Sequence, residues 1–171
     1  MPESSPSTPE QWFALLYAEL RKLAAGKLRL MPPSGVSPTT LVHELYLNLN
    51  GRVIGFPDQN RFLGYAGRAM RGLIIDFARE RQALKRGGGF QITHLTGQVG
   101  EDVADDAQLV RLSEALDALA LIDAPLAELV DLRYFCGLSY EEIAAMRGTS
   151  VRTAQRDWEK ARLLLYRELG V

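Results

Sequence analysis

The chain has 171 residues, of which 47% are hydrophobic and 24% are charged, as is usual for a globular protein, and its single cysteine, Cys136, excludes an internal disulfide. The net charge of −1 hides an asymmetry, because residues 1–95 carry 12 Lys and Arg against 7 Asp and Glu, a net +5, whereas residues 96–171 carry 8 against 14, a net −6. No apolar run approaches the roughly 18 residues that span a bilayer, and the start of the chain does not resemble a signal peptide, so we expect a cytoplasmic protein.

Apolar residues at helical spacing predict three helices in the first half of the chain. They follow a Ser/Pro-rich segment, 1–9, that we expect to be disordered. The second helix begins near Ser37 or Pro38, because proline suits a first helical turn. The three helices span about 11–30, 37–50 and 61–83, with breaks at 31–35 and 51–60.

The third helix is strongly basic, because the segment 61–86 holds seven Lys and Arg against only two acidic residues. Phe62, Tyr65 and Phe77 are interleaved with these charges. Basic side chains neutralise phosphates and exposed aromatic rings stack on unpaired bases, so the helix is a candidate surface for nucleic acid. The alternative is an ordinary amphipathic helix with a solvated basic face and aromatic residues in its core.

Residues 97–106 are polar and acidic and show little apolar periodicity, which predicts a flexible linker. We therefore expect an all-α fold of two small helical domains, 10–96 and 107–171. The second domain begins with helices at about 107–121 and 125–135.

The segment 138–169 has the pattern of a helix-turn-helix. Ser139 and Glu142 form a capping box for a short first helix, and Gly148 supplies the left-handed residue that ends it. Ser150 caps a second helix that extends to about Leu169. In a helix-turn-helix the start of the second helix enters the major groove of DNA. Here that start carries Arg152, Thr153, Gln155, Arg156 and Lys160.

Three groups of segments carry a family resemblance: 66–71 with 76–79 and 85–88, then 132–144, then 156–162. In this order and spacing they resemble an extracytoplasmic-function (ECF) sigma factor, the two-domain initiation subunit of bacterial RNA polymerase. The resemblance implies sigma region 2 at 10–96 and sigma region 4 at 107–171. It also implies core RNA polymerase and promoter DNA as partners, with no enzymatic activity, no cofactor and no metal.

The resemblance assigns roles to particular residues. Region 4 reads the −35 promoter element, which makes Arg152, Thr153 and Arg156 candidate base readers, with Gln155 and Lys160 nearby. Region 2 binds the −10 element, and the loop 51–60 matches the segment that holds a flipped −10 base. The candidate −10 contacts are Arg68, Arg71, Arg79, Arg81, Lys85 and Arg86.

The start of the predicted second helix departs from the family pattern. ECF sigma factors usually carry an acidic run just before Leu-Val-x-Glu, and this run faces a basic part of the polymerase clamp. Here Leu41-Val42-His43-Glu44 follows Ser37-Pro38-Thr39-Thr40, so hydroxyl groups replace the negative charges. The polymerase-facing candidates are Thr39, Thr40, His43 and Glu44.

This departure resembles ECF groups that lack the acidic run and are associated with serine/threonine kinases. Phosphorylation of Thr40 or Thr39, with Ser37 as the weaker candidate, supplies about −1.5 to −2 charges at a helix N-terminus, where anions are favoured. Simple helix capping by these hydroxyls is the alternative. A serine/threonine kinase is therefore an expected partner, and an anti-sigma factor is a further candidate.

A stand-alone helix-turn-helix regulator with a helical sensing domain is the alternative function, and it needs no polymerase. An enzyme is not expected, since the sequence offers no nucleophile–base pair, metal-ligand set or phosphate-binding loop. The resemblance also implies that the free protein can pack its two domains together. In that case we expect the acidic segment 101–106 to lie near the basic segment 79–86.

Overall fold

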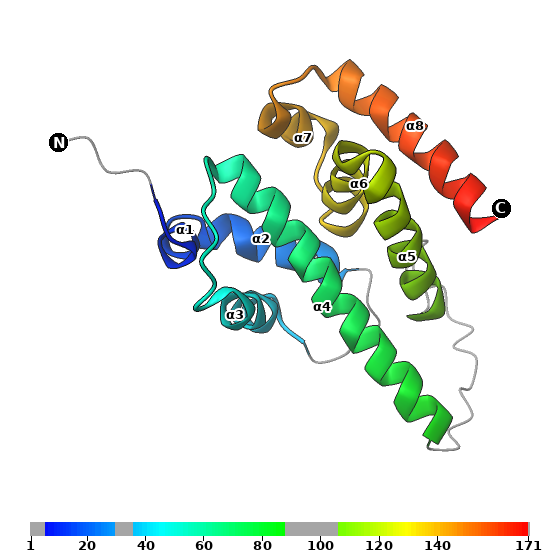
Figure 1. Cartoon of the computed structure of the whole chain (residues 1–171), viewed down its shortest axis with the longest axis horizontal. Helices are drawn as coiled ribbons and strands as arrows, with labels where there is room; N and C mark the ends of the chain where they lie inside the picture. The colour runs from blue at the N-terminus through cyan, green and yellow to red at the C-terminus, as the bar shows by residue number, and fades with distance from the viewer. Residues whose placement is uncertain (1–5, 30–35, 88–105, 171) are drawn as a thin grey trace.

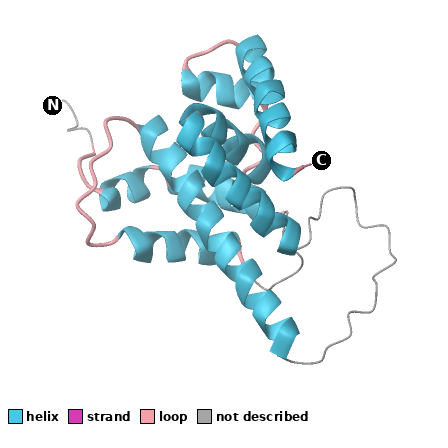
Figure 2. Ribbon diagram, turned by 45° about the vertical axis from the view of Figure 1, so that its right-hand side comes forward, coloured by secondary structure: helices cyan, strands magenta, loops and turns pink. Residues whose placement is uncertain are grey.

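A computed structural model describes residues 6–29, 36–87 and 106–170, with the side chains of 85–87 excepted. These residues form helices joined by turns, without a strand, so the all-α prediction is confirmed (Figures 1 and 2). Residues 1–5 and 97–105, which the sequence assigns to a disordered N-terminus and to the linker, lie outside the described residues.

Four helices form the N-terminal part of the fold. The predicted helix 11–30 is two helices, because the backbone of Leu16 (φ −111°, ψ 23°) leaves the helical region. This break allows Trp12 and Phe13 on one side and Leu20 on the other to pack into the same core. Thr8 caps the first helix with a capping box, so the helix begins at Pro9, earlier than predicted. The bounds are α1 Pro9–Leu15, α2 Tyr17–Leu28, α3 Pro38–Leu49 and α4 Gln59–Gly87.

The C-terminal part contains four α-helices and one π-helical turn. Asp106, predicted as the last residue of the linker, is the buried first residue of α5. The predicted helix 125–135 begins at Ala124, after Asp123 as N-cap, and its last turn is π-helical. The bounds are α5 Asp106–Ile122, α6 Ala124–Val130, η1 Asp131–Phe135, α7 Tyr140–Arg147 and α8 Val151–Leu169.

The two parts of the chain share their hydrophobic core. The cluster that fills the space between α1, α2, α3 and α4 continues into Leu132 and Cys136 at η1 and into Ile143 of α7. In turn Ile75 of α4 packs into the second cluster, which is built around α5, α6 and α8. α5 lies alongside α4, and α8 lies on the outer side of the molecule, away from α1 and α3 (Figure 1). The N- and C-terminal helices are therefore packed into one closed arrangement.

Candidate nucleic-acid interface

The helix-turn-helix is formed by α7 and α8, and its predicted caps are confirmed. Ser139 Oγ accepts a hydrogen bond from the Glu142 backbone N–H at 3.1 Å, and Glu142 Oε2 accepts one from the Ser139 N–H at 2.8 Å. Gly148 ends α7 with φ 63°, a conformation that a side chain disfavours. Ser150 Oγ then caps α8 by accepting from the Thr153 N–H at 3.1 Å. These local bonds fix the turn between the two helices.

The start of α8 presents part of its predicted DNA-binding set to solvent. Arg152, Gln155 and Arg156 are exposed. Thr153 is half-buried, and its hydroxyl lies 2.9 Å from Ser150 Oγ. Lys160 Nζ lies 3.3 Å from Asp123 Oδ2, in an ion pair with the N-cap of α6. The three exposed side chains are therefore the best placed for contact with DNA.

Arg71, a predicted −10 contact, is buried in the closed arrangement. Its Nη1 donates to the Ser113 carbonyl oxygen at 3.0 Å and to Ser113 Oγ at 3.1 Å. Its Nη2 lies 3.0 Å from Asp117 Oδ1, and its Nε lies 3.0 Å from Asp131 Oδ1. Arg68, three residues earlier on α4, is exposed. In this arrangement Arg68 can reach DNA and Arg71 cannot.

Further along α4, acidic residues of α5 occupy other predicted −10 contacts. Arg81 forms a forked ion pair with Asp106, with Nη2 to Oδ1 at 2.7 Å and Nε to Oδ2 at 3.1 Å. Arg79 Nη2 lies 4.0 Å from Glu114 Oε1 in a more exposed pair. The contact expected between the acidic segment 101–106 and the basic segment 79–86 is thus present at Asp106. The side chains of Lys85 and Arg86 and all of residues 101–105 lie outside the described part.

The aromatic residues of α4 divide between core and surface. Phe62 is fully buried and stacks on Trp12 with ring centroids 5.8 Å apart, as the alternative core interpretation expects. Tyr65 and Phe77 are half-buried. Phe56, from the loop before α4, lies against Tyr65 with centroids 5.3 Å apart. Phe62 is therefore unavailable to unpaired bases, whereas the half-buried Tyr65 and Phe56 line a pocket together with Arg68.

Residues 4–171 match the family model of the ECF sigma factor. The chain belongs to the ECF sigma factor family. A sigma factor of this family acts with core RNA polymerase at promoter DNA to direct transcription initiation, and it is a regulator rather than an enzyme. The stand-alone helix-turn-helix regulator is accordingly not favoured. Comparison with the curated proteins and with the solved structures gave no match.

In this sigma factor the start of α3 carries the residues predicted to face polymerase. Ser37 is the N-cap, and its Oγ accepts from the Thr40 N–H at 3.1 Å and lies 2.9 Å from Thr40 Oγ1. Thr39, Thr40 and His43 are exposed, whereas Glu44 is half-buried. The first turn of α3 contains no acidic residue. The helix end is therefore electrically positive and accessible.

A buried cluster of charges that no sequence motif indicated lies where α2, α4 and η1 meet. Lys27 is fully buried, with Nζ 3.8 Å from Asp131 Oδ1 and 4.8 Å from the ring centroid of Phe135. Its Nζ has no hydrogen-bond partner among the described residues. One feature of the sequence did indicate that Lys27 is buried. Lys27 lies four residues after Leu23, and this spacing places it on the apolar face of its helix.

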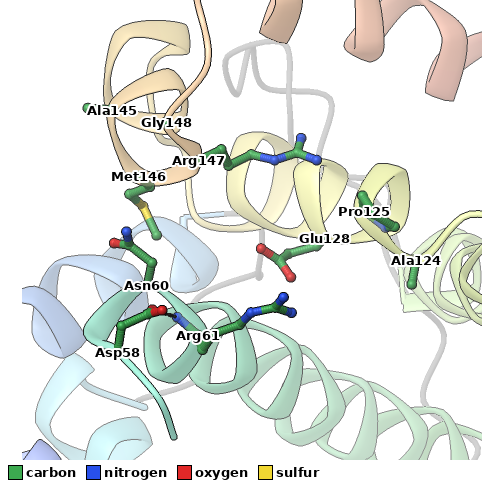
Figure 3. A pocket seen from close by; sticks show the side chains of 10 residues that line it. All are labelled: Asp58, Asn60, Arg61, Ala124, Pro125, Glu128, Ala145, Met146, Arg147 and Gly148. Carbon is green, nitrogen blue, oxygen red and sulfur yellow. Dashed lines mark hydrogen bonds between the residues drawn. The ribbon is translucent and has the colours of Figure 1, made fainter.

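A cavity of about 530 Å³ opens between the start of α4, α6 and the end of α7 (Figure 3). Glu128 of α6 projects into it between Arg61 of α4 and Arg147 of α7. Burial raises the pKa of Glu128 above its usual value, and the two arginines oppose this shift only in part. Glu128 also packs on Gly64 of α4, so the carboxylate is held at the junction of the two parts of the chain.

Residues 6–29, 36–87 and 106–170 contain neither a candidate metal site nor a candidate membrane span. No three His, Cys, Asp or Glu side chains are arranged there to hold a metal ion. None of the helices in these ranges is long and apolar enough to cross a membrane. Cys136 is a free, buried cysteine.

Proposed function

We propose that this ECF sigma factor binds core RNA polymerase weakly until Thr39 or Thr40 is phosphorylated. The proposal places the protein in the group that lacks the acidic run of region 2.2 and is controlled by a serine/threonine kinase. The observation that carries it is the start of α3, where two threonines are exposed and the first turn has no acidic residue. A phosphate at this position supplies the negative charge that a basic polymerase surface requires.

The hydrogen bonds at the start of α3 distinguish the two threonines. The Thr40 hydroxyl already pairs with Ser37 Oγ, whereas Thr39 makes no side-chain hydrogen bond in the described structure. On an α-helix, Thr39 shares a face with His43 and Thr40 shares one with Glu44. A phosphate on Thr39 is thus placed beside an imidazole, and one on Thr40 beside a carboxylate. The local charges favour Thr39 as the acceptor.

The same proposal assigns the DNA contacts. Arg152, Gln155 and Arg156 are exposed at the start of α8, which supports their role at the −35 element, with Thr153 and Lys160 beside them. For the −10 element we propose Arg68 together with the arginines that α5 covers in the closed arrangement. The covered group is Arg71, Arg79 and Arg81; Lys85 and Arg86 continue the same helix. Binding of the −10 element therefore requires α5 to leave α4.

The test is capture of purified core RNA polymerase by the wild type, Thr39→Glu and Thr40→Glu, and by wild type treated with a kinase-active lysate. We expect weak capture by the wild type and strong capture by the treated protein and by at least one Glu variant. Asn48→Asp is the matched control, because it adds one negative charge at the exposed far end of the same helix. Equal capture by all forms overturns the switch and leaves an anti-sigma factor as the candidate regulator.

A further inference from the structure

The closed arrangement covers one of the two candidate DNA surfaces of the protein, on α4, and leaves the other, at the start of α8, exposed. On α4, Arg71 is buried and Arg81 forms an ion pair with Asp106 of α5. The ion pairs place α5 antiparallel to α4, with Asp117 beside Arg71 and Asp106 beside Arg81. An extended nucleic-acid strand cannot follow the basic face of α4 while α5 occupies it.

The start of α8 is left uncovered by the same packing. The side chain of Arg156 is 77% exposed, and Arg152 and Gln155 are exposed beside it. α8 lies on the outside of the molecule, and its N-terminal end points away from α4 (Figures 1 and 2). The buried stripe of α8 faces α5 and α6 instead. No helix of the N-terminal part covers these three side chains.

Closure also changes the charge that DNA meets at the C-terminal helices. This half of the chain is acidic, and an acidic surface repels phosphates. In the closed arrangement Asp106, Asp117 and Asp131 each face an arginine of α4, so part of the acidic charge is neutralised internally. The first turn of α8 contains no acidic residue. Closure therefore masks single-strand binding on α4 while it favours approach of a duplex to α8.

We propose that the free, closed protein binds double-stranded DNA through Arg152, Gln155 and Arg156 before core polymerase binds. In the order of events, duplex binding by α8 comes first, and strand binding by α4 follows only after α5 separates from α4. The inference rests on the DNA roles given under the proposed function. It does not depend on the phosphorylation of α3, since the start of α8 is exposed in the chain with unmodified Thr39.

The experiment uses the full chain without polymerase. A duplex is first selected by the free protein from a random-sequence library, and fluorescence anisotropy then measures binding of this duplex and of its separated strands. We expect the wild type to bind the duplex in a salt-sensitive manner and the separated strands weakly. Arg156→Ala lowers duplex affinity about tenfold, while Arg167→Ala, an exposed arginine at the far end of α8, leaves it within about twofold.

A variant that cannot close distinguishes strand binding by α4 from duplex binding by α8. Gly26→Ala blocks closure, because its β-carbon meets the Cys136 backbone, and it is expected to raise affinity for the separated strands without raising affinity for the duplex. The inference is overturned if the free wild type selects no duplex, or if Gly26→Ala gains duplex binding and strand binding together. A parallel selection uses the kinase-treated protein together with core polymerase. It distinguishes the causes, because recovery of a promoter duplex only in that arm refutes this inference and leaves the proposed function standing. Selection of no duplex in either arm refutes both.

Discussion

Gly26 of α2 lies against the backbone of Cys136 so closely that a β-carbon on Gly26 would stand 1.7 Å from the Cys136 carbonyl oxygen. No side chain fits there unless the two parts of the chain move apart, since the obstructing atom belongs to the backbone. Gly67 of α4 also lies close to this cysteine, because a β-carbon added to Gly67 would be 3.7 Å from Cys136 Sγ. Cys136 therefore marks the junction between the N- and C-terminal helices.

Gly26→Ala is expected to open this junction and expose the thiol of Cys136. Cys136 is 3% exposed in the wild type, and burial raises the pKa of its thiol, so the thiol should react slowly with a thiol reagent. Because the chain has a single cysteine, the rate of labelling by a chromogenic disulfide reports opening directly. We expect the variant to be labelled about tenfold faster or more under native conditions.

Gly72→Ala is the matched control for this measurement. Gly72 lies within α4, and a β-carbon there meets nothing within 4 Å. Alanine is the better helix former by about 1 kcal/mol, so the control should be at least as stable as the wild type. Equal labelling rates for Gly26→Ala and the wild type would show that the junction tolerates a side chain and is not tightly closed.

Asp131→Asn is expected to lower the free energy of unfolding by about 3–5 kcal/mol, the usual cost of breaking a buried ion pair from one side. Asp131 is the acidic partner of both Lys27 and Arg71, and all three side chains are buried. The amide keeps the shape of the carboxylate but leaves the buried Lys27 without its acidic partner and leaves Arg71 with only the more exposed Asp117. Urea unfolding monitored by circular dichroism provides the measurement.

A surface ion pair is the reference for this effect. Glu159→Gln removes the carboxylate that pairs with Arg162 on the exposed face of α8. We expect a loss of no more than about 1 kcal/mol, because water screens the pair. If Asp131→Asn is no more costly than Glu159→Gln, the buried cluster does not depend on its carboxylate.

Glu128→Gln is expected to change how stability depends on pH. Since the pKa of Glu128 is raised in the folded protein, the folded state holds this proton more tightly than the unfolded state does. The resulting stabilisation is present below the usual pKa of 4.5 and is lost as the pH rises through the raised value. The variant lacks this titration, so its stability relative to the wild type should increase over that window. Unfolding curves at several pH values test this, with Glu141→Gln, an exposed carboxylate of α7, as control.

The local parts of the candidate DNA-binding site were predictable from the sequence because short-range signals determine them. Ser139 and Glu142 need only each other to form the capping box, and Gly148 needs only its own positive φ. The contacts between the two parts of the chain were not predictable in this way. Arg71 stands in the same basic run as Arg68, and the packing of α5 and η1 on α4 decides that Arg71 is buried and Arg68 exposed.

The same distinction explains the two largest departures from the predicted elements. Asp106 belongs to an acidic segment that is polar enough for a linker, yet its ion pair with Arg81 brings it into the first turn of α5. The helix predicted over 11–30 has unbroken apolar periodicity, and the break at Leu16 arises where Trp12 and Leu20 meet a common core. The start of α5 at Asp106 and the helix break at Leu16 both depend on residues that are far away in the sequence. Apolar periodicity alone therefore does not predict them.

Ser139→Ala is expected to destabilise the protein by about 0.5–2 kcal/mol and to weaken DNA binding by the helix-turn-helix. The alanine removes the acceptor for the Glu142 N–H and half of the capping box at the start of α7. Glu142 is also paired with Lys22 of α2, and hydrogen bonds from Lys22 and from the Ser139 backbone lower its pKa. Without the cap, the carboxylate is held less firmly at the junction with α2, so labelling of Cys136 should also accelerate. Thr149→Ala, in the exposed turn after α7, is the control, and equal unfolding curves for the two variants would mean that the capping box does not stabilise α7.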